Sequence, residues 1–221
     1  MRVHFVVEGQ TEETFVRNVL APELGARGVY CDAHRVTTGR RNAKVYRGGL
    51  VSFAHLRKDL ELWMKQDNAS DSWFTTMVDL YRLPSDFPSI TESRAIADPI
   101  KKVELLEQSF SSAMDHPRFV PYVQLHEFEA LLFSDPQSFS IAFPGIGAEV
   151  AKLQAIRSAF DTPEHIDERE DFAPSKHILK ILPQYDKALS GPLIAKQIGL
   201  AKLRRECPHF DSWLVRLEAA R

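Results

Sequence analysis

Cysteine is scarce in this chain, which has only two, Cys31 and Cys207, among its 221 residues. They lie far apart in sequence and form neither a metal-binding nor a redox pair, so we expect free thiols and a reducing compartment. Long apolar runs are also missing. The run at residues 3–7 is broken by His4 and is too short for a signal peptide, and no later run approaches the ~18 apolar residues of a membrane span. These absences predict a cytoplasmic protein that does not cross a membrane.

Several sequence signatures of common enzymes are absent. The chain contains no P-loop, no dinucleotide-binding glycine motif and no nucleophile elbow, which argues against the enzyme classes that depend on them. An excess of charge is absent as well, since 28 Lys and Arg face 30 Asp and Glu for a formal net charge of −2. With 44% apolar and 26% charged residues, the composition is that of a globular protein and excludes a disordered or collagen-like chain.

The charges that are present are segregated along the chain. Residues 33–58 hold no Asp or Glu but seven cations, which are Arg35, Arg40, Arg41, Lys44, Arg47, Arg57 and Lys58. Acidic residues dominate residues 161–171, and cations return over residues 176–205. Within the first block, four residues are candidates for contacts to a nucleic-acid backbone, namely Arg40, Arg41, Lys44 and Arg47. A solvated loop and helix face explains the same residues equally well.

Strand and helix patterns alternate over the first 135 residues. Runs rich in β-branched and aromatic residues predict strands at residues 3–7, 29–38, 73–78 and 119–125. Helical spacing predicts helices after a cap at Thr11 and over residues 52–66 and 98–114, with a basic loop at residues 39–49. Such alternation is typical of an α/β fold with a largely parallel sheet flanked by helices, whose ligands bind beyond the carboxyl ends of the strands.

From residue 136 onward the sequence contains no convincing strand. Helical patterns recur at residues 147–160, 175–182, 192–206 and 213–220. We therefore expect two parts, an α/β core at residues 1–135 and a helical C-terminal extension at residues 136–221 that packs on the core.

Two carboxylates stand directly after predicted strands. Glu8 follows the first strand, and Asp79 ends the strand at residues 73–78. If these strands are neighbours, both side chains converge on one edge of the sheet and suit Mg²⁺ or Mn²⁺, which prefer hard oxygen ligands. The alternative is that each residue only caps a turn or a helix, as acidic residues at strand ends commonly do.

Glu12 and Asp86 are weaker candidates. Glu12 falls in the first turn of the helix that follows Glu8, where the helix macrodipole alone favours an acid. Asp86 lies in a loop bracketed by Pro84 and Pro88, and ordering of that turn explains it without any role in a site.

A polar cluster, HEFE at residues 126–129, follows the fourth strand. In an extended backbone Glu127 and Glu129 share a face, whereas in a helix that begins at His126 they diverge by about 200° and only one can enter a site. The apolar residues that follow favour the helix, and we take Glu127 as the first candidate and Glu129 as the second. His126 is a weak candidate metal ligand, because a lone histidine at a strand end more often satisfies backbone groups.

Lys176 follows Pro174 and Ser175 at the start of the helix predicted for residues 175–182. An ammonium group there would neutralise charge on a phosphoryl transition state. The structural alternative is a helix start that Ser175 caps.

Five segments together resemble an uncharacterised bacterial family, domain of unknown function 4276, over nearly the whole chain. They are EGQTE at residues 8–12, DLYRLP at 79–84, HEFEALLF at 126–133, PSK at 174–176 and CPHF at 207–210. The family looks like a divergent branch of the Toprim superfamily, which includes topoisomerases, primases and OLD-type nucleases. The resemblance implies a Toprim-like fold, an association with an ATPase partner and a role in phage defence.

A Toprim site has one glutamate after the first strand and an Asp-x-Asp pair after a later strand, which bind Mg²⁺ for phosphodiester chemistry. By resemblance, Glu8 takes the glutamate position and Asp79 takes that of the first aspartate. Tyr81 replaces the second aspartate. Two-metal catalysis therefore requires another oxygen ligand, from Glu127, Glu129 or Asp86.

Two functions follow as hypotheses. In the first, the chain is a metal-dependent nuclease, in which Glu8, Asp79 and Glu127 hold the metal with Glu129 as a further ligand. Lys176 then stabilises the phosphate, and residues 40–47 grip the nucleic-acid backbone. In the second, the chain is a non-catalytic Toprim-like module that binds nucleic acid or an ATPase partner. A small-molecule phosphotransferase or hydrolase is a third class, because many α/β enzymes use carboxylates at a sheet edge.

Overall fold

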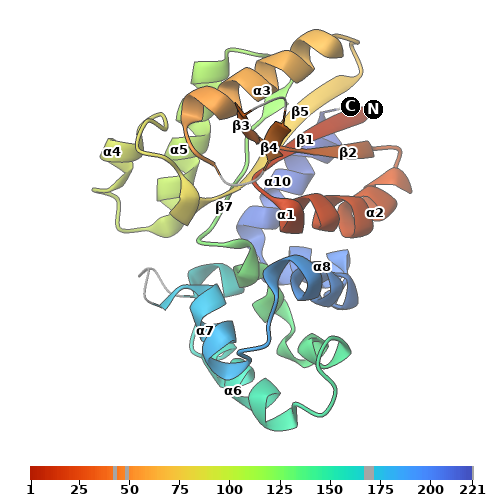
Figure 1. Ribbon diagram of the computed structural model, residues 1–221, viewed down its shortest axis with the longest axis vertical. Helices are drawn as coiled ribbons and strands as arrows, with labels where there is room; N and C mark the ends of the chain where they lie inside the picture. The colour runs from red at the N-terminus through yellow and green to blue at the C-terminus, as the bar shows by residue number, and fades with distance from the viewer. Residues whose placement is uncertain (42–43, 48–49, 167–171, 221) are drawn as a thin grey trace.

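The computed structural model describes residues 1–41, 44–47, 50–166 and 172–220 (Figure 1). At the centre is a five-stranded sheet in the order β2-β1-β5-β6, with β7 also paired to β5. All of these pairings are parallel. The strands are β1 (Arg2–Val7), β2 (Tyr30–Arg35), β5 (Ser72–Asp79), β6 (Phe119–Val120) and β7 (Val123–Gln124). The predicted fold class, a largely parallel sheet flanked by helices and followed by a helical C-terminal region, is confirmed.

The two central strands, β1 and β5, are buried along almost their whole length. Burial on both faces explains why β1 is a nearly continuous apolar run and not an alternating one. Val7 lies opposite Arg35 of β2 on one side and Met77 of β5 on the other. The carboxyl ends of β1 and β5 therefore lie side by side, and Glu8 and Asp79 stand at that edge.

One face of the sheet packs against α3 (Phe53–Gln66) and α5 (Pro99–Met114), with the short helix α4 (Ile90–Ser93) beside α5. The core between them includes Val6, Phe74 and Leu60, all buried. Both long helices begin as the sequence predicts, because Ser52 accepts the amide of His55 and Asp98 accepts the amides of Ile100 and Lys101.

The other face packs against a continuous helical segment and against α10 (Pro208–Ala219). The segment consists of α1 (Gln10–Phe15), a π-helical turn η1 (Val16–Leu20) and α2 (Ala21–Gly25). On α10, the Trp213 ring packs edge-on against Phe5 with a centroid distance of 5.7 Å, and its indole Nε1 donates to Thr75 Oγ1 at 2.8 Å. The last helix of the chain is thus tied to the middle of the sheet.

The region after β7 is helical, as predicted. Its elements are η3 (Phe128–Ser134), η4 (Pro136–Ile141), α6 (Gly147–Arg157), η5 (Pro163–His165), α7 (Pro174–Ile181), α8 (Lys187–Ile198), α9 (Leu200–Glu206) and α10. In Figure 1, α6 and α7 lie at the end of the molecule away from α3, and α10 returns to the sheet. One hydrophobic core holds residues from both sides of position 135. The division of the chain at residue 135 stays a prediction.

Several predicted boundaries are wrong. The strand expected at residues 29–38 ends at Arg35, and part of the expected basic loop is a hairpin of β3 (Thr37–Arg41) and β4 (Lys44–Arg47). Strand formers on both sides of that hairpin, such as Thr37 and Val45, explain the difference. The strand expected at residues 119–125 is interrupted at Pro121, which lacks the amide proton a ladder needs.

Three helix starts also differ from the expectation, and one of them is that of α10, which begins at Pro208 and not at residue 213. The N-cap of α1 is Gly9, and Thr11 lies buried in the first turn. The helix expected at residues 192–206 is two helices. The first, α8, begins five residues earlier at Lys187 and ends at Ile198, because the next residue, Gly199, has a φ of 79° and the helix cannot continue. Asp186 caps α8 by accepting the amide of Leu189 at 2.9 Å. None of the helices in the described ranges combines the length and apolarity that a bilayer crossing requires.

Candidate functional site

Glu8 and Asp79 meet at the carboxyl edge of the sheet because β1 and β5 are parallel neighbours. The amide of Glu8 donates to Met77 O at 3.1 Å, so Glu8 extends the ladder of β1 by one bond. The amide of Asp79 donates to Glu8 Oε2 at 3.3 Å. Strand pairing thus fixes both backbone positions before any side chain from the helical region is added.

Three further side chains complete a group that we call the carboxylate cluster, which consists of Glu8, Glu12, Asp79, Glu129 and Lys187. The Lys187 Nζ atom lies 3.1 Å from Asp79 Oδ2, 3.1 Å from Glu129 Oε2 and 3.8 Å from Glu12 Oε1. These residues come from the ends of two strands and from α1, η3 and α8. The cluster therefore joins the sheet edge to the helical region.

The neighbours of the cluster hold its carboxylates in place. Asp79 Oδ1 accepts the amide of Phe128 at 3.0 Å, which fixes the start of η3, and the Tyr185 hydroxyl donates to Glu129 Oε1 at 3.4 Å. Helix α8 approaches its neighbours closely at Gly191, which has no side chain. A Cβ atom there would lie 3.0 Å from the Tyr185 hydroxyl oxygen and 3.1 Å from the Phe128 ring.

Burial raises the pKa values of the carboxyl groups in the cluster. The exposed fraction is 3% for Glu12, 2% for Asp79 and 0% for Glu129. Desolvation, together with repulsion from Asp79, raises the pKa of Glu8 to about 8 and that of Glu12 to about 7. Desolvation raises the pKa of Glu129 to about 7, and it also raises the pKa of Asp79.

For Lys187, attraction to neighbouring charges outweighs the effect of burial on the pKa. Burial alone would lower its pKa, but the attraction of Asp79, Glu129 and Glu12 is larger and raises the pKa above its ordinary value. The side chain therefore stays an ammonium ion. Among the described residues, it is the only Lys or Arg in ion-pair contact with the cluster. The site holds more carboxylates than cations.

Glu127 and Glu129 adopt neither of the two arrangements expected from the sequence. The backbone is extended at Glu127 and turns into the 3-10 helix η3 at Phe128. Glu129, the second candidate, is the one that contacts Lys187, while Glu127 Oε2 accepts the amide of Ser175 at 3.1 Å. The charge of Glu127 still contributes to the raised pKa of Asp79. Glu127 thus lies beside the cluster and anchors the start of α7.

The other candidates lie apart from the cluster contacts. Lys176 is exposed in the first turn of α7 and makes no ion pair with the cluster carboxylates, all of which are described. Asp86 is exposed, and its Oδ1 atom accepts the amide of Phe53 at 2.9 Å, at the start of α3. His126 is buried in the left-handed region with φ of 59°, and its ring centroid lies 5.2 Å from that of Tyr81. Tyr81 belongs to the short turn η2 (Leu80–Arg82).

The proposed nucleic-acid contacts fall partly outside the described structure. Arg40, Arg41, Lys44 and Arg47 have backbones in β3 and β4, but their side chains lie outside what the structure describes. Within the acidic segment, residues 167–171 lie outside the described residues as well.

Sequence reasoning missed Lys187 and Tyr185. A helix that starts at Pro192 leaves Lys187 in a loop, since proline is favoured in the first turn. The sequence signal that was available is Asp186, a good N-cap residue directly before Lys187. Glu12 was undervalued because the helix macrodipole alone explained an acid in the first turn of α1.

Comparison with known proteins gives a family match and distant structural likenesses. The C-terminal region of the Burkholderia pseudomallei OLD protein has a TM-score of 0.47 and 12% identity, covering 100% of this chain and 98% of that chain. The C-terminal region of the Xanthomonas campestris pv. campestris OLD protein, in a structure phased with platinum, has a TM-score of 0.42 and 16% identity, covering 100% and 97%. No curated protein matches the sequence. Residues 7–218 match the family described as a domain of unknown function, DUF4276, so the chain belongs to that family, as the sequence motifs indicated.

Proposed function

We propose that this chain is a divalent-metal-dependent nuclease with a Toprim-like carboxylate centre that hydrolyses phosphodiester bonds in nucleic acid. One observation carries the proposal, which is the convergence of Glu8, Glu12, Asp79 and Glu129 at the carboxyl edge of a parallel sheet. Ligands of open α/β sheets bind at this edge. The motif resemblance to the Toprim superfamily supports the same chemistry, since Glu8 and Asp79 match its first two carboxylate positions.

The donor set of the cluster fits Mg²⁺ or Mn²⁺. Carboxylate oxygens are the ligands that these ions prefer. The raised pKa values of Glu8, Glu12 and Glu129 indicate that the cluster lacks positive charge, because burial and mutual repulsion are not offset by Lys187 alone. A divalent cation supplies the missing charge. Within this proposal Glu8 and Asp79 hold the ion, and Glu12, Glu129 and Glu127 complete the oxygen ligands.

When bound, the ion provides Lewis-acid activation of a water and of a phosphoryl oxygen. Lys187 favours the ionised forms of Asp79 and Glu129 against the effect of desolvation, and it orients both through its two contacts of 3.1 Å. Its ammonium group, like that of Lys176 at the start of α7, is suited to stabilise negative charge on a phosphate. Glu127 positions the start of α7 through the Ser175 amide, which supports the assignment of Lys176, the next residue, to this site.

The proposed binding partners, nucleic acid and an ATPase, are inferred from charge and from the family resemblance. We assign contacts with the nucleic-acid backbone to Arg40, Arg41, Lys44 and Arg47 on the β3–β4 hairpin. By resemblance to OLD-type nucleases, we propose an ATPase partner and a role in phage defence.

Cleavage of plasmid DNA and of RNA by the purified protein, with and without Mg²⁺ or Mn²⁺, tests the proposal. Glu8→Gln and Asp79→Asn keep side-chain size but remove ligand charge, so each should lower the cleavage rate by more than about a hundredfold. Glu92→Gln, at an exposed acid on α4, is the matched control and should cleave like the wild type. Activity retained in both cluster variants would refute this assignment of the site.

A second candidate function is a non-catalytic module that binds nucleic acid or an ATPase partner. Two observations favour it: the Lys187 ammonium already contacts Asp79 and Glu129, and Tyr81 stands at the position of the second Toprim aspartate. This candidate predicts nucleic-acid binding without Mg²⁺ or Mn²⁺ binding. Such binding should weaken steeply with salt, because phosphate contacts release counterions.

A further inference from the structure

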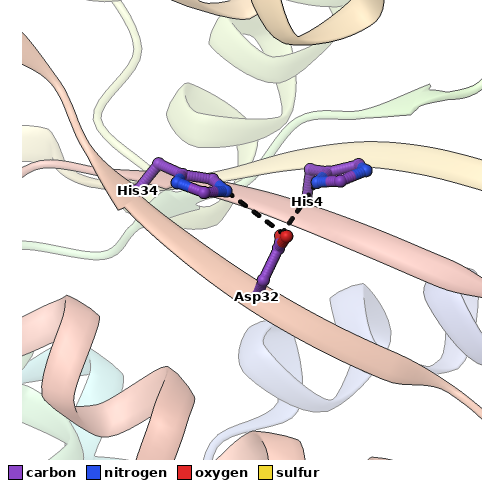
Figure 2. A group of neighbouring side chains, drawn as sticks. All are labelled: His4, Asp32 and His34. Carbon is purple, nitrogen blue, oxygen red and sulfur yellow. Dashed lines mark ion pairs between the residues drawn. The ribbon is translucent and has the colours of Figure 1, made fainter. Parts of the chain in front are cut away.

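A second group of ligand-type side chains lies on the first two strands, away from the carboxylate cluster (Figure 2). His4 is on β1, and Asp32 and His34 are on β2. In the parallel pairing of these strands, His4 lies opposite Asp32, and His34 is two residues further along β2. Side chains at i and i+2 share a face, so strand register brings all three residues together on one side of the sheet.

The three side chains offer donor atoms that all lie within 4.8 Å of one another. His4 Nδ1 is 2.9 Å from Asp32 Oδ1, and His34 Nε2 is 3.4 Å from Asp32 Oδ2. Donor atoms around a tetrahedral zinc ion are about 3.4 Å apart, given zinc–ligand distances near 2.1 Å. The donor atoms of the three side chains are therefore close enough that small side-chain shifts would bring them to these separations.

Outer residues orient the His4 ring for this purpose. His4 Nε2 is hydrogen-bonded to Asp67 Oδ2 at 2.9 Å, and Asp67, at the end of α3, is paired with Arg2 at 2.9 Å. Ionised carboxylates only accept, so His4 Nε2 donates to Asp67 and Nδ1 donates to Asp32, and a metal ion at Nδ1 takes the place of that proton. A carboxylate on the far nitrogen of a histidine is the usual second-shell arrangement at metal sites.

Two buried nitrogens in this group are turned toward Asp32. His4 is 7% exposed, and its Nδ1 atom and His34 Nε2 both lie within ion-pair distance of the Asp32 carboxylate. The His34 ring is held by stacking on Trp63, with centroids 3.5 Å apart and an interplanar angle of 20°. Two nitrogens with fixed orientation that face one carboxylate are suited to a metal ion that replaces the protons between them.

We propose that His4, Asp32 and His34 bind a divalent transition-metal ion of the zinc class. Two imidazoles and one carboxylate are a donor set for such ions and not for Mg²⁺, which takes oxygen ligands. Access is available because the Asp32 side chain is 50% exposed, which leaves a coordination position open to water. Cys31 is not part of the site, since it packs against the core on the opposite face of the sheet.

The site is separate from the carboxylate cluster. His4 precedes Glu8 by four residues along β1, which corresponds to about 13 Å in a strand. An ion here would fasten the edge strand β2 to β1 and, through Asp67, to the end of α3. The proposal therefore does not depend on the proposed nuclease activity.

Zinc and cobalt titrations of the metal-free full chain test the proposal. Calorimetry should give one tight Zn²⁺ site per chain, and Co²⁺ should give the intense visible bands of four- or five-coordination. A free zinc concentration about 100 times the Kd should raise Tm by roughly 5 to 10 °C. Absence of tight Zn²⁺ binding, or only the weak bands of six-coordinate Co²⁺, would overturn the proposal.

Variants locate the bound ion. Asp32→Asn and His34→Gln should weaken Zn²⁺ binding by more than about a hundredfold, and Asp67→Asn, which changes only an outer carboxylate, by about 10- to 100-fold. The control His55→Gln, at an exposed histidine, should bind like the wild type. The pair Glu8→Gln and Asp79→Asn should also keep the zinc affinity. If zinc binding is lost in that pair and kept in Asp32→Asn and His34→Gln, the ion is at the carboxylate cluster and the proposal is wrong.

Discussion

Replacement of Lys187 by methionine tests the electrostatics of the carboxylate cluster. The change keeps most of the apolar stem but removes the ammonium group that lies 3.1 Å from both Asp79 and Glu129. Breaking a buried ion pair costs about 3–5 kcal/mol because the remaining charge is left uncompensated. Since the Lys187 side chain is 39% exposed, water screens part of the attraction, and we expect a loss of about 2–3 kcal/mol at about pH 8.

The loss should depend on pH in a defined direction. Glu12 and Glu129 have pKa values raised to about 7, so below about pH 5 both are protonated and need no counter-charge. A carboxyl with a raised folded-state pKa lowers stability as the pH rises from its unfolded value through the folded one. The deficit of Lys187→Met should therefore be smaller near pH 5 than near pH 8.

Thermal unfolding at the two pH values measures this effect. At about pH 8 the expected deficit corresponds to a Tm lower by about 5–10 °C for a chain of this length. Lys196→Met, at an exposed lysine on the same helix, is the matched control and should change Tm little. A deficit of equal size at both pH values, or none at either, would refute the assignment of Lys187 as the counter-charge of the cluster.

Three further predictions concern the framework around the site. Gly191→Ala should lower stability by roughly 1–3 kcal/mol, because the added Cβ meets the Tyr185 hydroxyl at 3.0 Å; unchanged urea unfolding would contradict this. Desolvation raises the pKa of Glu164 to about 7. The stability of the wild type should therefore fall relative to that of Glu164→Gln by on the order of 3 kcal/mol as the pH rises from about 4.5 to 7. Parallel pH profiles of Tm for the two proteins would contradict this. Trp213→Phe removes the bond to Thr75 and should cost about 1–3 kcal/mol in calorimetry, whereas an unaltered Tm would show that this contact contributes nothing.

The strand ends were predictable because local sequence determines them. The apolar run before Glu8 and the strand formers before Asp79 mark buried strands, and in a parallel sheet the carboxyl ends of neighbouring strands meet. Sequence alone could not show that β1 and β5 are the neighbours, which their hydrogen-bond register settles. The position of Glu8 and Asp79 at the carboxyl edge of the sheet was therefore predictable from the residue pattern, given the assumption that β1 and β5 are neighbours.

Contacts that depend on tertiary packing were not predictable. Lys187 contacts Asp79 although the two residues are 108 positions apart in sequence. The sequence pattern predicts a helix that starts at Pro192, whereas α8 begins directly after its N-cap, Asp186, and so includes Lys187. Glu129 replaces Glu127 as the contact of Lys187 because a 3-10 turn follows an extended residue, a geometry between the two alternatives considered. His4, Asp32 and His34 form a group only through the register of β1 and β2, which no local pattern encodes.

The central claim is that the carboxylate cluster is a metal centre. Its most direct test is a titration of the metal-free protein with Mn²⁺, in which the electron paramagnetic resonance signal of the free ion measures how much Mn²⁺ is bound. The proposed function predicts binding by the wild type and by Asp32→Asn, which alters only the separate histidine-containing group. It predicts loss of that binding in Glu8→Gln and in Asp79→Asn. Mn²⁺ binding that persists in both cluster variants, or no binding by the wild type, would contradict the account of the carboxylate cluster as a metal centre.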